Sequence, residues 1–144
     1  MGAKEYFIIT VWPVCLDKVD KIKTLVSENY IITKDLELKF DISWDEMVRG
    51  IYKDDRVKEK NIVSKIDVYS KFPKAIHLIY IDVPRPKYRF KKDGRKLSTA
   101  MERLKKKVRG FYGAKKDPNA NPIHIVDEYK HSINYDKFLE GLEK

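Results

Sequence analysis

The sequence predicts an α+β fold in which strands and helices form a layered sandwich. Two observations support this prediction. Runs of β-forming apolar residues alternate along the chain with segments of helical period, and the order of these elements contains a split β-α-β arrangement. The chain has 144 residues, which suits one domain of about 100–200 residues. We therefore expect a single domain over residues 1–144, without a linker or an internal repeat.

Four segments have the composition of strands. Glu5–Val11 is a continuous apolar run that Pro13 ends, and Ala75–Val83 is a second run of this kind, as expected for buried strands. Tyr30–Phe40 alternates apolar and polar residues, which is typical of a half-buried strand. The fourth segment, Ile123–Val126, is short. These segments predict a sheet of four strands.

The segments between these strands show helical signals. One helix begins near Asp17, which is available as an N-cap. Ser43 and Glu46 form a capping box for a helix that continues to about Tyr52. The later helical patterns cover residues 56–68, with Val57, Ile62, Val63 and Ile66 facing inward, residues 97–108 and residues 133–142. Residues 110–122 contain two glycines and two prolines and predict a loop.

Lysine and arginine outnumber aspartate and glutamate by 31 to 22, which gives a net charge of +9. Such a charge favours phosphate-bearing partners, nucleotides and nucleic acid alike, and a lysine-rich solvated surface explains it equally well. Cys15 is the one cysteine, so it excludes an intramolecular disulfide and a cysteine-rich zinc site. Its apolar neighbours predict a buried thiol.

The longest apolar stretch, Tyr6–Leu16, is too short to cross a bilayer, which requires about 20 residues. It follows one basic residue and lacks a small-residue cleavage site, so it does not resemble a signal peptide. We therefore expect a cytoplasmic protein that does not associate with membranes.

His124 is the candidate catalytic residue. It lies in a short apolar segment, three residues after Asn121 and three residues before Asp127. A neutral imidazole, with a reference pKa of about 6.5, is a competent nucleophile when one nitrogen is hydrogen-bonded and the other faces the substrate. A lone histidine in a strand is more often structural. The polar residues at these offsets favour the functional interpretation.

Other residues of the same types have simpler interpretations. We expect His77 to be a satisfied histidine within the sheet, and His131 to be solvated in a polar turn. Lys105-Lys106-Lys107 is interpreted as a solvated helix face, with a phosphate-contacting patch as the alternative. Trp12 is expected in the core or an interface, and stacking of its ring on a base is the alternative.

The C-terminal part of the chain resembles nucleoside diphosphate kinases. In this family an arginine-glycine pair precedes a loop, an asparagine, the phosphate-accepting histidine and an aspartate three residues later. Here these positions are Arg109-Gly110, Asn121, His124 and Asp127. The order of elements is also similar over residues 5–142.

Two residues outside that segment extend the resemblance. Gly94-Arg95 is similar to the family's glycine-arginine pair after the third strand, and Tyr52 sits where the family has a tyrosine near the active histidine. The resemblance implies a ferredoxin-like sandwich with a four-stranded antiparallel sheet covered by helices, assembled as a homo-oligomer. It also implies a nucleotide-binding phosphotransferase that acts through a phosphohistidine on His124.

The resemblance assigns a role to each of the matching residues. Arg95 and Arg109 would hold phosphate, and Tyr52 would belong to the nucleotide site. Asn121 would orient the nucleotide or the histidine, and Asp127 would support the loop. Mg²⁺ would arrive with the nucleoside di- or triphosphate, so no residue of the chain is expected to be a dedicated metal ligand.

The sequence departs from the family at several of its characteristic positions. The family's lysine-proline-aspartate motif is absent, because Trp12-Pro13-Val14 stands in its place. Lys60 falls near the aromatic residue on which the base stacks in the family, and Lys18 is a candidate replacement for the missing lysine. These departures leave open two alternatives to the phosphotransferase that the resemblance implies: a relative that acts on a different substrate, and a catalytically inactive module that binds nucleotide, nucleic acid or a protein partner.

A nucleic-acid binder without sequence preference is the competing prediction from another class. Arg109-Gly110-Phe111 resembles the start of the signature of RNA-recognition domains, but Tyr112 and Gly113 depart from it. The net charge and the nine tyrosines fit such a protein.

Overall fold

In the computed structural model, the described residues are 5–53, 57–84, 87–92, 95–111, 123–125 and 129–142. Four antiparallel strands form the main sheet in the order β2-β3-β1-β6. Their bounds are β1 Glu5–Val11, β2 Ile31–Lys39, β3 Ala75–Val83 and β6 Ile123–Ile125. A separate two-stranded sheet contains β4, Tyr88–Phe90, and β5, Lys96–Ser98.

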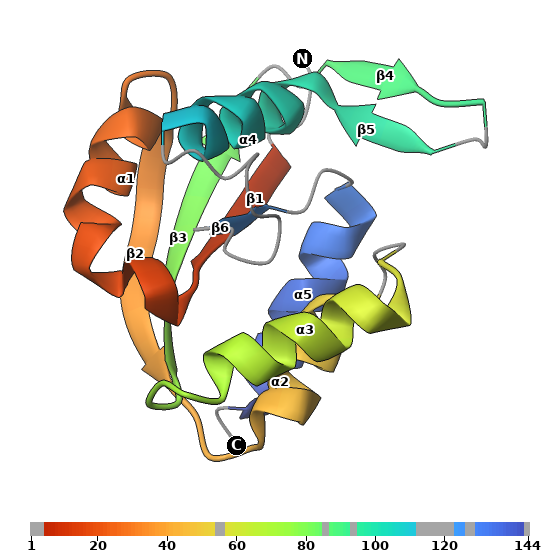
Figure 1. Cartoon of the computed structure of the whole chain (residues 1–144). Helices are drawn as coiled ribbons and strands as arrows, with labels where there is room; N and C mark the ends of the chain where they lie inside the picture. The colour runs from red at the N-terminus through yellow and green to blue at the C-terminus, as the bar shows by residue number, and fades with distance from the viewer. Residues whose placement is uncertain are drawn as a thin grey trace.

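Helices cover both faces of the main sheet (Figure 1). α1 and α4 lie on one face, and α2, α3 and α5 lie on the other. The helical elements are the 3₁₀ helix η1 Pro13–Lys18, α1 Val19–Ser27, α2 Trp44–Ile51, α3 Glu59–Tyr69, α4 Thr99–Phe111 and α5 Tyr129–Leu142. This arrangement confirms the α+β sandwich that the order of elements predicts.

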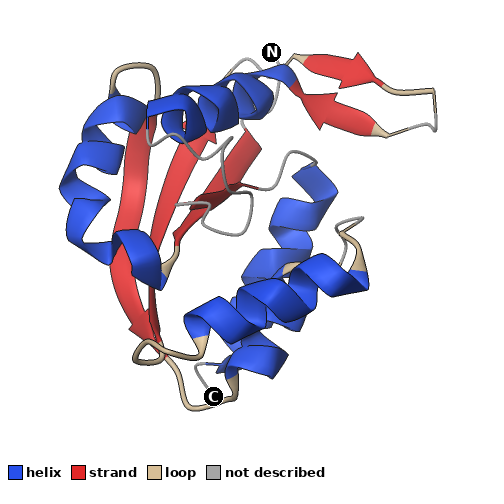
Figure 2. Ribbon diagram, viewed as in Figure 1, coloured by secondary structure: helices blue, strands red, loops and turns tan. Residues whose placement is uncertain are grey.

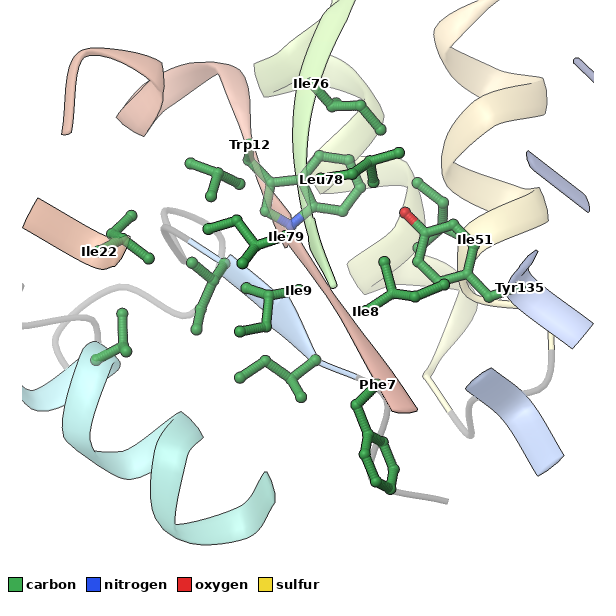
Figure 3. Close-up of a cluster of buried hydrophobic side chains, with 14 of the residues drawn as sticks. Phe7, Ile8, Ile9, Trp12, Ile22, Ile51, Ile76, Leu78, Ile79 and Tyr135 are labelled. Carbon is green, nitrogen blue, oxygen red and sulfur yellow. The ribbon is translucent and has the colours of Figure 1, made fainter. Parts of the chain in front are cut away.

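The central position of β1 in the sheet explains why its sequence is apolar without alternation. Ile9 faces Ile22 of α1, while the next residue along the strand, Ile8, faces Ile51 and Tyr135 on the opposite side (Figure 3). Both isoleucines are fully buried. Because each face of a central strand is covered, each fully buried Ile, Val or Phe side chain of β1 contributes about 1.5–3 kcal/mol of burial free energy. The strand can therefore position polar residues rigidly within the core.

The predicted strands are confirmed, and the helix boundaries differ in detail. Ser43 is the N-cap of α2 as predicted, because its side chain accepts a hydrogen bond from the Glu46 amide at 3.1 Å. Asp17 does not cap α1: it lies in η1, and α1 begins at Val19 after an N-cap without a side-chain bond. Val63 was predicted to face inward, but it is 52% exposed.

The C-terminal half shows two further differences from the predictions. Leu97, expected in a helix, belongs to β5 in a hairpin that stands apart from the main sheet (Figure 2). Strands of three residues are too short to show alternation, so the pattern of the following helix obscured them. α5 begins at Tyr129, before the predicted start, and therefore places His131 in a helix with 9% exposure. The prediction of a solvated turn at His131 was wrong.

Candidate aromatic site around His124

His124 is the middle residue of β6 and pairs with Thr10 of β1. Directly paired residues point to the same face of a sheet, so His124 shares the face of Thr10, which α5 covers. The Thr10 hydroxyl is 2.5 Å from the Tyr135 hydroxyl of α5. The imidazole is only 3% exposed. It therefore lies between the sheet and the helices and not on the molecular surface.

Two tyrosines lie against the imidazole. The ring of Tyr52, at the C-cap of α2, meets it edge-on with the centroids 4.6 Å apart. The ring of Tyr135 lies on α5, with its centroid 6.2 Å from that of His124. Both tyrosines are themselves buried. The sequence prediction that Tyr52 lies near His124 agrees with this contact.

Trp12 extends this group of rings. Its indole is nearly parallel to the Tyr52 ring, with centroids 6.1 Å apart, and stacks on the Tyr69 ring of α3 with centroids 4.5 Å apart. All three rings are buried, which confirms the expectation that Trp12 is a core residue. We call Trp12, Tyr52, Tyr69 and Tyr135 the aromatic cluster. Trp12, which replaces the motif lysine of the resembling family, thus packs as a core aromatic and presents no cation to His124.

Lys65 is a residue of this site that the sequence interpretation missed. It lies on α3 one turn before Tyr69 and is only 5% exposed. Its ammonium lies over the Tyr52 ring, 5.7 Å from the centroid, within the range of a cation–π interaction. A lysine in a charged helix is expected to be solvated, so nothing in the sequence indicates that this side chain lies against the Tyr52 ring. Tyr52 therefore contacts both a buried imidazole and a buried ammonium.

The chemistry of this site is that of a tightly packed, low-dielectric interior. Burial raises the pKa of the Tyr135 phenol far above its ordinary value. Tyr135 thus remains a neutral hydroxyl over the physiological pH range, and it interacts with Thr10 as a hydrogen-bonding group and not as an acid. Proton transfer from this phenol is disfavoured.

The structure places the other predicted site residues as follows. Arg95 is half-buried and immediately precedes β5, on the hairpin that projects from the body in Figure 1. Arg109 lies in α4, and nothing is described of its side chain. Asn121 and Asp127 fall outside the described residues. The roles assigned to these four residues remain predictions.

Two other lysines singled out in the sequence lie away from this site: Lys18, the candidate replacement for the family's lysine, and Lys60, which falls near the place of the family's base-stacking aromatic residue. Lys18 is on η1, where its ammonium lies 3.8 Å from a carboxylate oxygen of Asp17 and is partly exposed. Lys60 is exposed in the first turn of α3. Neither side chain is part of the aromatic cluster. Of the described lysines, Lys65 is the one that we find against a ring of the cluster.

The described part of the chain contains neither a metal-binding cluster nor a helix that could span a membrane. No group of three or more His, Cys, Asp or Glu side chains there is arranged to hold a metal ion. None of the helices described combines the length and the apolar character needed to span a membrane.

Comparisons with known proteins show a likeness of structure without a likeness of sequence. No protein-family model matches the chain, and no curated protein does. The nucleoside diphosphate kinase of Aquifex aeolicus has a similar structure, with a TM-score of 0.59, 15% identity and 95% coverage of each chain. The enzyme from Pyrobaculum aerophilum gives a TM-score of 0.60 at 11% identity, with 94% of this chain and 95% of that chain covered.

The third similar structure is a transition-state mimic of the enzyme from Borrelia burgdorferi with bound vanadate and ADP. Its TM-score is 0.63 at 12% identity, and the match covers 94% of this chain and 86% of that chain. At these identities the likeness shows the fold alone. The chain therefore has a divergent nucleoside diphosphate kinase-like fold over nearly its whole length.

Proposed function

We propose that this chain is a catalytically inactive module of the nucleoside diphosphate kinase fold, which binds phosphate-bearing ligands and does not transfer phosphate through His124. The observation that supports this proposal is the 3% exposure of His124 between Tyr52 and Tyr135. A histidine buried between two rings is poorly accessible to an incoming phosphate.

Phosphoryl transfer requires two things that this arrangement disfavours. The acceptor must approach the transferred phosphorus in line, and cations must stabilise the charge on the equatorial oxygens. Among the described residues, the rings of Tyr52 and Tyr135 lie against His124, and Trp12 stands where the family has its lysine. Moving a charged phosphate into apolar surroundings without compensating groups is strongly unfavourable. The packing around His124 therefore stabilises the fold and disfavours phosphoryl transfer.

Binding of phosphate-bearing ligands is supported by charge and by fold. The net charge of +9 attracts anions, and a similar structure holds ADP and vanadate. Nucleoside di- and triphosphates are therefore the first ligands to test, and nucleic acid is the second. We also propose that the protein self-associates, by analogy with the nucleoside diphosphate kinases that its sequence resembles.

One observation favours a second candidate function, a phosphotransferase that uses a phosphohistidine. Lys65 and His124 border the same Tyr52 ring, so a shift of that ring would bring a cation and an imidazole into one space. In that case Arg95, Arg109 and Asn121 would bind the nucleotide. Mg²⁺ would be carried by its phosphates, since this ion is usually bound through substrate phosphates and few protein ligands.

Incubation with γ-labelled ATP and Mg²⁺ separates the two functions. We expect no acid-labile, base-stable label on this protein under conditions in which the Aquifex aeolicus enzyme is labelled. We also expect ADP to bind with equal affinity to the wild type and to the His124→Ala variant in calorimetry. Label that appears on the wild type and is lost in His124→Ala would overturn the proposal and establish the phosphohistidine. Absence of ADP binding would remove nucleotides from the proposed ligands.

A further inference from the structure

The positive charge of the chain is concentrated in one continuous segment, residues 87–111. This segment contains eleven Lys or Arg and two Asp or Glu, so its net charge of +9 equals that of the whole chain. In the structure it forms the β4–β5 hairpin and α4, which follow one another along the upper edge of Figure 1. The basic character therefore belongs to one region, and the remainder of the sequence is electrically balanced.

The hairpin projects from the body of the protein (Figures 1 and 2). We call its described residues, 87–92 and 95–98, the basic arm. Phe90, at the end of β4, is 70% exposed and pairs with Lys96 across the arm. It also stands next to Arg89 and Lys91 in sequence. A single exposed apolar residue is common and needs no explanation. An exposed ring that has several cations beside it is the combination found in proteins that bind single-stranded nucleic acid.

The arm is held to the body by defined contacts. Arg89 donates two hydrogen bonds to the Glu102 carboxylate of α4, at 2.7 and 3.3 Å. Leu97, on the same face of the arm as Arg89, is buried. Within the arm itself, Lys96 places its ammonium 3.9 Å from the centroid of the Tyr88 ring. Because the arm is already ordered, a ligand would bind it at a smaller cost in conformational entropy.

The basic surface continues along α4. Arg103 and Lys106 are exposed and are three residues apart, so they lie on the same side of the helix. Lys107, in contrast, donates to the Leu25 carbonyl and is paired with Glu28 at 3.3 Å. The exposed cations of α4 thus extend the charge of the arm over a second element.

We infer that the basic arm and the exposed side of α4 bind single-stranded nucleic acid. Proteins that bind single strands combine cations that follow the phosphate backbone with aromatic rings on which bases stack. Phe90 provides the ring, and Lys91, Lys92 and Lys96 provide neighbouring cations. A duplex hides the faces of its bases, so an exposed ring favours an unpaired strand. This inference does not depend on the chemistry at His124, which lies in the core.

The test is fluorescence anisotropy with a labelled oligothymidylate and with a duplex of equal length. Phe90→Ala should raise the dissociation constant for the single strand by about 5-fold to 150-fold, and Phe90→Trp should restore binding. The double variant Lys91→Gln/Lys92→Gln should reduce the salt dependence, lowering the slope of log K against log salt by about 1.4 for two lost phosphate contacts. The protein should prefer the single strand to the duplex.

The matched control removes two lysines from the opposite end of the molecule. Lys39 ends β2 and Lys71 follows α3, and both are exposed; the variant Lys39→Gln/Lys71→Gln should keep the wild-type slope. Equal losses in the two double variants would overturn the inference, because binding would follow net charge alone. An unchanged affinity in Phe90→Ala, or a preference for duplex, would also overturn it. So would binding to vesicles of anionic lipid without binding to the oligonucleotide.

Discussion

The imidazole of His124 meets the ring of Tyr52 edge-on, with their centroids 4.6 Å apart. This contact joins β6 of the sheet to the C-cap of α2. The two residues lie together as the family resemblance implies. The Tyr52 ring, however, also packs against Trp12, which follows β1, and against Lys65 on α3. It thus encloses His124 and leaves it 3% exposed.

The aromatic cluster is expected to be a major source of stability. Trp12→Ala removes a fully buried indole that stacks on two rings and should lower the free energy of unfolding by about 3–5 kcal/mol. Phe90→Ala is the matched control, because it removes an aromatic ring that is 70% exposed and should change stability by no more than about 0.5 kcal/mol. Denaturant titrations measure both values. Similar effects of the two substitutions would contradict the role of the cluster.

Gly50 allows the helices α2 and α5 to approach each other closely. A Cβ at this position would collide with the ring of Phe138 on α5, whereas one at Gly141 would meet open space. Gly50→Ala should therefore destabilise the protein although alanine is the better helix former by about 1 kcal/mol. Gly141→Ala should be neutral or slightly stabilising. Thermal unfolding of both variants checks this, and a stabilised Gly50→Ala protein would show that the helices are not in this contact.

Alkaline pH should weaken the fold through Tyr6. Burial, followed by the charge and hydrogen bonding of Asp136, raises the pKa of this phenol to about 12, and its hydroxyl donates to Asp136 at 3.3 Å. The folded state holds the proton more tightly than the unfolded chain, whose tyrosine pKa is 10.0. The stabilisation is therefore complete below about pH 10 and is lost as the pH rises towards 12.

Unfolding measurements from about pH 9 to 12 test this dependence on pH. In Tyr6→Phe the loss of stability should be smaller than in the wild type over this range. An absorbance titration of the tyrosines should likewise lose one group that ionises late. If wild type and variant lose stability in parallel, Tyr6 does not have the environment described here.

The sequence was most informative where burial is continuous along the chain. β1 and β3 are covered on both faces, so their apolar runs identify them without knowledge of their partners. The cap of α2 was also predictable, because Ser43 and Glu46 are close in sequence and their interaction is local. The position of His124 in a strand followed from the same kind of local pattern.

The surroundings of His124 could not be predicted in this way. Trp12, Tyr69 and Tyr135 come from three distant elements, and their stacking is a property of tertiary packing. Lys65 was missed because an ammonium in an amphipathic helix is normally solvated, and the ring that covers it comes from α2. The basic arm was missed because its strands have three residues each.

The accessibility of the imidazole tests the central claim most directly. Modification by diethyl pyrocarbonate, located by mass spectrometry, compares His124 with His77, whose side chain is 15% exposed and whose Nε2 donates a hydrogen bond to Asp35. We expect His124 to react much more slowly than His77 in the native protein, and at the same rate in denaturant. Native modification of His124 as fast as that of His77 would contradict the enclosed site and restore the case for a phosphate-accepting histidine.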